Sequence, residues 1–193
     1  TYTLVSKEMA SIFNYDNKTS IVLPNPMSAD KSVIRTSILP SLLNVYDYNK
    51  ARKVEDVYLY EISKTYDNTY KEDMKLAILI KGNYMNNSWQ NMNFKGDFYY
   101  LKGILENLLD YLGFKNRYQV KPEKIADLHP GIGAKIYLDR EEIGIIGRIN
   151  PTINSNEIYV LELSITKLNK VTKPIKYKQY SKYPSIVKDM AFI

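Results

Sequence analysis

The segment Asn25-Pro-Met-Ser-Ala-Asp-Lys-Ser-Val-Ile-Arg-Thr-Ser-Ile-Leu-Pro-Ser-Leu-Leu43 is the most informative part of the chain. An Asn-Pro turn leads through a short polar stretch to Arg-Thr-Ser, and an apolar helix with an early proline follows. A helix that only fills a core needs a polar cap and an apolar face. Such a helix does not need Asn25, Pro26, Arg35 and Pro40 at these intervals. The order of these four residues therefore indicates a role beyond filling the core.

The helix predicted from this segment covers roughly residues 36–52. Thr36 or Ser37 can cap it, and Pro40 falls in the first turn, where backbone N–H groups have no helical partner to lose. Apolar residues at spacings of three and four form one face, which consists of Ile38, Leu39, Leu42, Leu43 and Tyr46. From the residues alone, this face is either core or a surface that packs against a partner helix.

The sequence on both sides of this segment predicts an α+β fold, in which helices flank an antiparallel sheet. Runs rich in Val, Ile and Tyr, many of them alternating with polar residues, predict strands. These strands cover residues 2–6, 21–23, 56–66, 76–81, 118–120, 134–138, 143–149 and 158–165. Short polar turns join several of them into hairpins, which are typical of antiparallel sheets. The helices come in separate blocks, which excludes a doubly wound parallel sheet.

Two further helices are predicted from their caps. Ser6 can cap a helix that ends near Phe13. Asp97 can cap a helix over residues 98–112, and Gly113 follows where a left-handed residue often ends a helix. The buried stripe of this second helix is expected to consist of Phe98, Leu101, Leu105, Leu108 and Leu112. The Asn-rich residues 82–95 before it are expected to form a loop.

Length and composition limit the kinds of protein that this chain can be. The chain has 193 residues, of which 45% are hydrophobic and 25% charged, enough for one core and a small appendage. No apolar run reaches the roughly 20 residues that cross a bilayer, and the first residues do not resemble a signal peptide. Cysteine is absent, which excludes disulfides and thiolate zinc sites. We expect a cytoplasmic protein without membrane contact, and a piece of a longer chain because no Met precedes Thr1.

The positive charge is concentrated at the C-terminal end. Between Lys167 and Lys188 there are seven lysines and no acidic residue. Removing these seven from the 27 basic residues leaves 20, against 21 acidic ones, so the rest of the chain is almost neutral. A neutral body argues against nucleic-acid binding by the whole domain.

The basic segment itself has two interpretations. Lysines can neutralise phosphates and tyrosines can stack on bases, which favours RNA contact. The candidate residues for such a contact are Lys173, Lys176, Lys178 and Lys182, interleaved with Tyr177, Tyr180 and Tyr183. The alternative is a solvated linker with one face packed against a domain.

Other possible sites in the sequence have structural explanations. His129 is the single histidine, and in His-Pro-Gly131 its ring is expected to close a turn rather than act as a base. Gly131-Ile-Gly133 and Gly144-Ile-Ile-Gly147 lack the helix and the Lys-Ser/Thr of a phosphate loop, so close backbone packing is expected there. A weak magnesium site at the acidic turn over residues 67–73 is conceivable, but a polar loop explains it better. We predict no catalytic, cofactor-binding or metal-binding residue.

Six segments in order resemble the beta subunit of bacterial phenylalanyl-tRNA synthetase in its catalytic-like core. Any one match is weak, but together they cover almost the whole chain. The segments are Asn25–Leu43 with Asn49 and Arg52, Tyr60-Glu-Ile-Ser63, Asp97-Phe-Tyr-Tyr-Leu-Lys-Gly-Ile-Leu-Glu106, Leu128-His-Pro-Gly131, Ile143-Gly-Ile-Ile-Gly147, and Ser181-Lys-Tyr-Pro-Ser185 with Lys188-Asp189. The departures from the family pattern are Ser63 for a frequent Gly, Ile132 for a polar residue and Lys188 for Arg.

The resemblance implies a class II synthetase-like core over residues 1–166. It also implies that residues 167–193 are a basic linker and the truncated start of a ferredoxin-like anticodon-binding domain. The holoenzyme of this family uses ATP and magnesium to attach phenylalanine to its tRNA. Its expected assembly contains two catalytic alpha subunits and two beta subunits.

Class II chemistry depends on arginines that grip the phosphates of ATP. The corresponding strands here, 56–62 and 158–165, contain no arginine. The resemblance then implies a non-catalytic core without cofactors of its own, packed against the alpha subunit. The residues expected at this partner interface are Asn25, Arg35, Leu39, Leu43, Tyr46 and Asn49.

Overall fold

The computed structural model describes residues 1–14, 19–87, 89, 92–170, 182–184, 186 and 188–191. Six strands form one antiparallel sheet in the order β3-β4-β10-β9-β8-β7. In chain order they are β3 (Val57–Tyr66), β4 (Glu72–Lys81), β7 (Tyr118–Pro122), β8 (Leu128–Leu138), β9 (Glu141–Ile149) and β10 (Tyr159–Ser164). The predicted α+β class and antiparallel sheet are confirmed.

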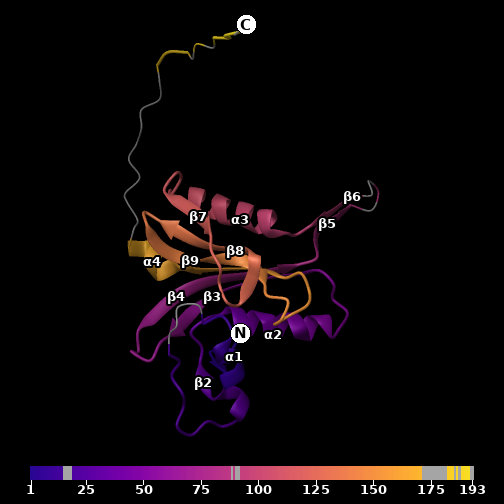
Figure 1. Ribbon diagram of the computed structural model, residues 1–193, viewed down its shortest axis with the longest axis vertical. Coiled ribbons are helices and arrows are strands. Elements are labelled where there is room, and N and C mark those ends of the chain that lie inside the picture. The colour runs from indigo at the N-terminus through magenta and orange to yellow at the C-terminus, as the bar shows by residue number, and fades with distance from the viewer. Residues whose placement is uncertain are drawn as a thin grey trace.

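Helices cover both faces of this sheet (Figure 1). Helix α3 (Phe98–Tyr111) lies on one face, and α2 (Leu39–Lys50) lies on the other together with the N-terminal segment. Each face has its own apolar cluster, one built around Leu105 and Ile146 and the other around Leu39 and Val160. Strand β10 lies between β4 and β9 and is buried along its whole length.

Helix α3 forms as its sequence predicts. The Asp97 side chain accepts a hydrogen bond from the Tyr100 N–H at 2.8 Å, and Gly113 adopts a φ of 84° just after the helix. Leu101 and Leu105 are buried as predicted, but Leu109 completes the stripe and Leu112 is exposed. The helix ends before residue 112, so that residue turns away from the sheet.

Helix α2 is shorter than predicted, because it begins at Leu39 rather than near residue 36. Thr36 and Ser37 precede the helix and form contacts with the sheet. Pro40 does fall in the first turn, and Lys50 ends the helix. The apolar face predicted for this helix is buried throughout, from Ile38 to Tyr46.

The N-terminal segment packs beside α2. Strand β1 (Leu4–Val5) pairs with β2 (Val33–Ile34), and the segment predicted as a strand at 21–23 makes only a single bridge, from Val22 to Val33. Helix α1 (Lys7–Ser11) has the predicted cap, since the Ser6 hydroxyl accepts a hydrogen bond from the Met9 N–H at 3.2 Å. A short 3-10 turn, η1 (Ala29–Lys31), lies between β1 and β2 in sequence.

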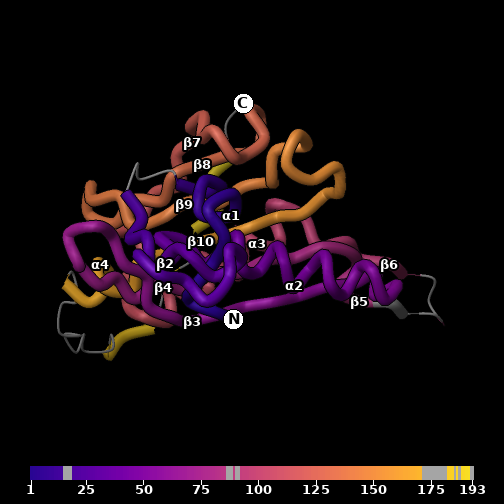
Figure 2. The backbone as a smooth tube through the Cα atoms, turned by 90° about the horizontal axis from the view of Figure 1, so that it is seen from below, coloured from indigo at the N-terminus to yellow at the C-terminus, as the bar shows by residue number. Residues whose placement is uncertain are grey.

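The loop prediction for residues 82–95 is wrong. Strands β5 (Asn83–Asn87) and β6 (Met92–Lys95) form a separate two-stranded antiparallel sheet, which projects from the body as an arm (Figures 1 and 2). Its Asn content hides the strands from pattern analysis, because Asn is depleted in strands. The arm is fixed at its base, where the Gly96 N–H donates to the Gly82 carbonyl at 2.8 Å.

Two other segments differ from their predictions. His129-Pro-Gly131 lies within β8, where the register against β9 shifts between Leu128 and Gly133, rather than in a turn between strands. Helix α4 (Ile165–Lys170) was not predicted. Among the described residues, no helix combines the length and the apolar character that crossing a membrane requires.

The glycines of β9 have the packing role that the sequence suggested. A Cβ atom on Gly144 would lie 2.0 Å from the Glu162 carbonyl oxygen of β10, and one on Gly147 would lie 2.5 Å from the Ile132 carbonyl oxygen of β8. Both glycines therefore allow neighbouring backbones to approach closely.

Candidate functional site

The Arg35-Thr36-Ser37 segment is attached to the sheet by a buried carboxylate. Glu162, on the central strand β10, is fully buried. Its Oε1 atom accepts hydrogen bonds from the Ile38 N–H at 2.7 Å and from the Ser37 hydroxyl at 2.9 Å. The carboxylate thus occupies the N-terminal end of α2, where backbone N–H groups lack helical partners and the helix dipole favours negative charge.

Lys75 on β4 compensates this buried charge. Its ammonium group lies 3.0 Å from Glu162 Oε2 and donates a second hydrogen bond to the Thr36 carbonyl at 2.9 Å. Both side chains of the ion pair are almost inaccessible to solvent. The pair, together with the polar groups of residues 36–38, satisfies charges that would otherwise be costly to bury.

A second ion pair holds Arg35. Its guanidinium lies 2.6 Å from Glu61 Oε1 on β3 and also donates to the Thr1 hydroxyl. Burial alone raises the pKa of Glu61, but the hydrogen bonds from Thr1 and Arg35 and the charge of Arg35 outweigh it. The pKa of Glu61 therefore lies below its usual value.

The basic side chains of the sheet are held in contacts with the protein itself. Among the described residues, the six strands carry one arginine, Arg148 on β9, and it lies 3.6 Å from the Glu157 carboxylate. The lysines are held in similar ways, since Lys135 lies between two carboxylates and Lys121 over the Tyr137 ring. These side chains therefore have contacts within the chain itself.

Four of the six residues predicted at the partner interface are buried within the chain itself. The side chains of Arg35, Leu39, Leu43 and Tyr46 are at most 5% exposed, because they pack on the sheet or pair with it. Direct contact with a partner through these four is not supported, and we assign them to the core. Asn25 is exposed. Asn49 is half-buried, and its amide donates to the Val45 carbonyl at 2.7 Å.

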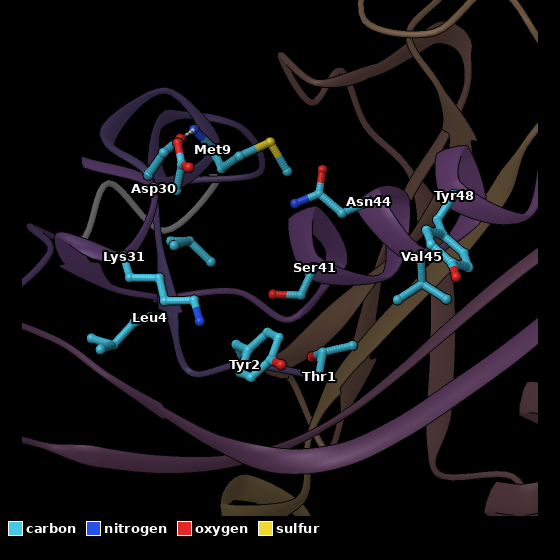
Figure 3. A pocket seen from close by; sticks show the side chains of 12 residues that line it. Thr1, Tyr2, Leu4, Met9, Asp30, Lys31, Ser41, Asn44, Val45 and Tyr48 are labelled. Atoms are coloured by element: carbon cyan, nitrogen blue, oxygen red, sulfur yellow. Dashed lines mark hydrogen bonds between the residues drawn. The ribbon is translucent and has the colours of Figure 1, made fainter. Parts of the chain in front are cut away.

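The outer side of α2 borders a recess of about 550 Å³ (Figure 3). Residues of β1, α1, η1 and α2 line it, and most of the lining is apolar, from Leu4 and Met9 to Val45. Ser41 points into the recess, and its buried hydroxyl has no hydrogen-bond partner among the described residues.

The remaining candidates have local roles or lie outside the described residues. The His129 ring accepts a hydrogen bond from the Gly131 N–H at 3.1 Å. In the described part of the chain, no three His, Cys, Asp or Glu side chains come together as a metal site. Of the candidate RNA contacts, Lys182 is exposed, while Lys173, Lys176 and Lys178 lie outside the described residues.

Sequence reasoning missed the acidic and basic residues of the buried network. The strand predicted over residues 158–165 gave Glu162 no role, although the central position of β10 buries both of its faces. The run Val-Leu-Glu-Leu at residues 160–163 could have indicated the buried ion pair, because a carboxylate inside an apolar strand needs a buried partner.

Fold and site together define an α+β domain in which helices pack on both faces of an antiparallel sheet. The family model for the phenylalanyl-tRNA synthetase beta chain CLM domain matches residues 1–165. The whole chain is 38% identical to the phenylalanine–tRNA ligase beta subunit of Geobacillus kaustophilus and 33% identical to those of Bacillus subtilis and Onion yellows phytoplasma. It spans about a quarter of the length of these relatives. The chain belongs to the phenylalanyl-tRNA synthetase beta chain family.

Replacing Lys75 by Met should destabilise the chain strongly. The substitution leaves Glu162 buried without its cation, so the free energy of unfolding should fall by about 3–5 kcal/mol. Adding Glu162→Gln should recover part of the loss, because it removes the unpaired charge. The control is Lys64→Met, which breaks the half-exposed pair with Glu72 and should change stability much less, because solvent screens that pair. Urea denaturation measures all three variants, and equal losses for Lys75→Met and Lys64→Met would contradict the buried pair.

The Glu61 carboxylate should make stability depend on pH at the acidic end. Its pKa is lowered in the folded chain, so its contribution is present above the usual value of 4.5 and is lost as the pH falls through the folded pKa. The difference in unfolding free energy between the wild type and Glu61→Gln should therefore be larger at pH 7 than below pH 4.5. Urea denaturation at several pH values tests this, with the exposed Glu141→Gln as control. A difference that is independent of pH would contradict the lowered pKa.

Proposed function

We propose that this chain is the catalytic-like core of the beta subunit of a phenylalanine–tRNA ligase and acts as a scaffold. In this proposal the core has a class II synthetase-like architecture, makes no contribution to the chemistry and packs against the catalytic alpha subunit. The assembled enzyme, of two alpha and two beta subunits, uses ATP and magnesium to attach phenylalanine to tRNA in the cytoplasm.

The scaffold role is supported by one observation: basic residues on the sheet are already paired with carboxylates of the same chain. Adenylate formation requires cations positioned to stabilise charge that develops on the phosphates. Here Arg148 pairs with Glu157, and Lys75 pairs with Glu162 in the core. These cations maintain the fold, so the ATP of the holoenzyme is assigned to the alpha subunit.

The family supports the role of the alpha subunit as partner. The relatives at 33–38% identity are named beta subunits of phenylalanine–tRNA ligase, which indicates a companion subunit of another kind. In this proposal the core lacks free phosphate-binding groups but is still part of the enzyme. Its contribution is then to hold the subunits together. Of the residues first assigned to this interface, Asn25 and Asn49 remain candidates.

The test is to separate the two subunits. The full-length beta subunit should co-purify with the alpha subunit, and aminoacylation should require both. By isothermal titration, the beta subunit alone should bind neither ATP with magnesium nor phenylalanine with a Kd below about 1 mM. Tighter binding that is lost when the sheet residue Arg148 is replaced by Met would show that this core holds a ligand itself and would overturn the scaffold role.

A second candidate function is tRNA binding through the C-terminal lysine and tyrosine segment. It is favoured by the seven lysines between Lys167 and Lys188, which no acidic residue interrupts. Such a segment can neutralise phosphates without a preformed pocket.

Salt dependence tests this second function. If the segment binds tRNA, replacing Lys173, Lys176 and Lys178 by Gln in the full-length subunit should reduce the slope of log affinity against log salt by about 2–3. Replacing Lys50, Lys53 and Lys115 in the body by Gln gives a charge-matched control. An unchanged slope in the first variant would exclude these lysines from tRNA binding.

A further inference from the structure

The recess beside α2 has the size of a binding site for a small molecule. Its volume is about 550 Å³, and sites for such ligands usually enclose about 300–1,000 Å³. Its lining comes from three parts of the chain, within residues 1–9, 30–31 and 41–48 (Figure 3). The recess therefore exists only because the N-terminal segment packs beside α2.

Hydrogen bonds hold the wall formed by β1, α1 and η1 in place. The Ser32 N–H donates to the Val5 carbonyl at 3.1 Å, which fastens β1 to the residue that follows η1. The Ser32 hydroxyl donates to the Ala29 carbonyl at 2.9 Å and closes η1. Because the Ser6 hydroxyl also caps α1, each element of this wall is fixed within the chain. The recess is thus formed before any molecule enters it.

The interior of the recess suits an aromatic ring. Leu4, Met9 and Val45 line it with aliphatic groups and a thioether, and the rings of Tyr2 and Tyr48 border it (Figure 3). A thioether and a tyrosine ring both form favourable contacts with aromatic rings, beyond the gain from burying apolar surface. The lining therefore favours an aromatic ligand over a purely polar one.

Ser41 provides a hydrogen-bonding group inside this apolar lining. The residue is 5% exposed, its hydroxyl is directed into the recess, and it has no hydrogen-bond partner among the described residues. A serine within a helix can donate to the carbonyl one turn earlier, but this hydroxyl does not. Alanine would form the helix more readily and would bury no polar group. The Ser41 hydroxyl is thus available to a molecule in the recess.

The charges of the lining favour a neutral ligand. Among the described residues that line the recess, Asp30 and Lys31 are the charged ones, and they are neighbours on η1. The Lys31 ammonium lies 4.3 Å from the centroid of the Tyr2 ring, which attracts it. One acid beside one base leaves little net charge to hold an anion or a cation, and a polyanion needs several cations.

We propose that the recess beside α2 is a binding site for a small, neutral aromatic molecule that carries a hydroxyl group, that is, a phenol. Its ring contacts Met9 and Val45, and its hydroxyl forms a hydrogen bond with the Ser41 hydroxyl. Both hydroxyls can donate and accept, so the buried oxygen is satisfied in either direction. The site is independent of the scaffold role, because residues of this chain alone form the recess.

The test compares three ligands that share one ring, namely p-cresol, toluene and benzoate, by ligand-observed NMR titration of the full-length beta subunit. Of these, p-cresol carries a neutral hydroxyl, toluene lacks it and benzoate has a charge instead. We expect p-cresol to bind with a Kd of about 1 mM or below, which is within reach of a ligand of this size. Toluene should bind about fivefold more weakly, because it forms no hydrogen bond. Benzoate should bind more weakly than p-cresol, since burying its charge is costly.

The variant Ser41→Ala separates the hydrogen bond from the apolar contacts. It should bind p-cresol about fivefold more weakly than the wild type, and toluene equally well. Its thermal stability without ligand should not fall, because the hydroxyl that it lacks has no partner among the described residues. The matched control is Ser63→Ala on β3, a half-buried serine outside the recess, which should bind p-cresol as the wild type does.

A second variant, Val45→Phe, locates the ligand. It places a larger side chain in the recess and should abolish the binding of both p-cresol and toluene. Thermal denaturation checks that this variant is folded. Loss of p-cresol affinity in Ser41→Ala and in Val45→Phe, with unchanged affinity in Ser63→Ala, supports the site.

Any of four results would overturn the proposed site. The first is the absence of p-cresol binding to the wild type at millimolar concentrations. The second is equal affinity of p-cresol for the wild type and Ser41→Ala, and the third is unchanged binding to Val45→Phe, which would place the ligand elsewhere. The fourth is a clear loss of stability in Ser41→Ala, which would show that the hydroxyl is bonded within the fold. The scaffold role is tested separately, by association with the alpha subunit.

Discussion

The fold depends on one buried carboxylate, Glu162, at the centre of the sheet. It lies where three elements meet, because its oxygens bind the Lys75 ammonium of β4 and the N–H of Ile38, the residue just before α2. A buried anion is stable only when such partners surround it. The position of β10 thereby fixes where α2 begins, and Arg35 with Glu61 fastens the preceding residues to the edge strand. The segment from Arg35 to Ile38 is thus held in place by charges from three strands.

The same arrangement of charges supports the scaffold role that we propose. In the described part of the chain, the single arginine of the sheet and several of its lysines form ion pairs with carboxylates of the same chain. These ion pairs hold elements of the fold together. Apolar and aromatic side chains border the recess beside α2 and remain exposed along β3. Protein surfaces of this kind favour contact with other proteins over phosphate binding. The proposed scaffold role follows from this distribution of charge.

The candidate site shows where reasoning from sequence alone fails. The Arg-Thr-Ser segment was found from its pattern, but Arg35 faces inward to Glu61 because β3 passes beneath it. The role of Glu162 was missed because an alternating pattern suggests one exposed face, and a central strand covered by helices on both sides has none. The arm was taken for a loop because pairing between two Asn-rich strands leaves no periodic apolar signal. The contacts of Tyr100 with Tyr58 and Tyr84 could not be seen either, since these rings meet only when α3 and the arm lie beside β3.

The sequence by itself determined the local structure and the family. Caps at Ser6 and Asp97, the left-handed Gly113 and the alternating strands depend on neighbouring residues, so they can be predicted from a short window. The ordered motifs likewise identified the family, which the comparison over residues 1–165 confirmed. Only the tertiary structure decided which charges are buried, where α2 starts and which aromatic side chains stay exposed. These features depend on contacts between residues far apart in the chain, such as Ser37 with Glu162, and no local pattern encodes such a contact.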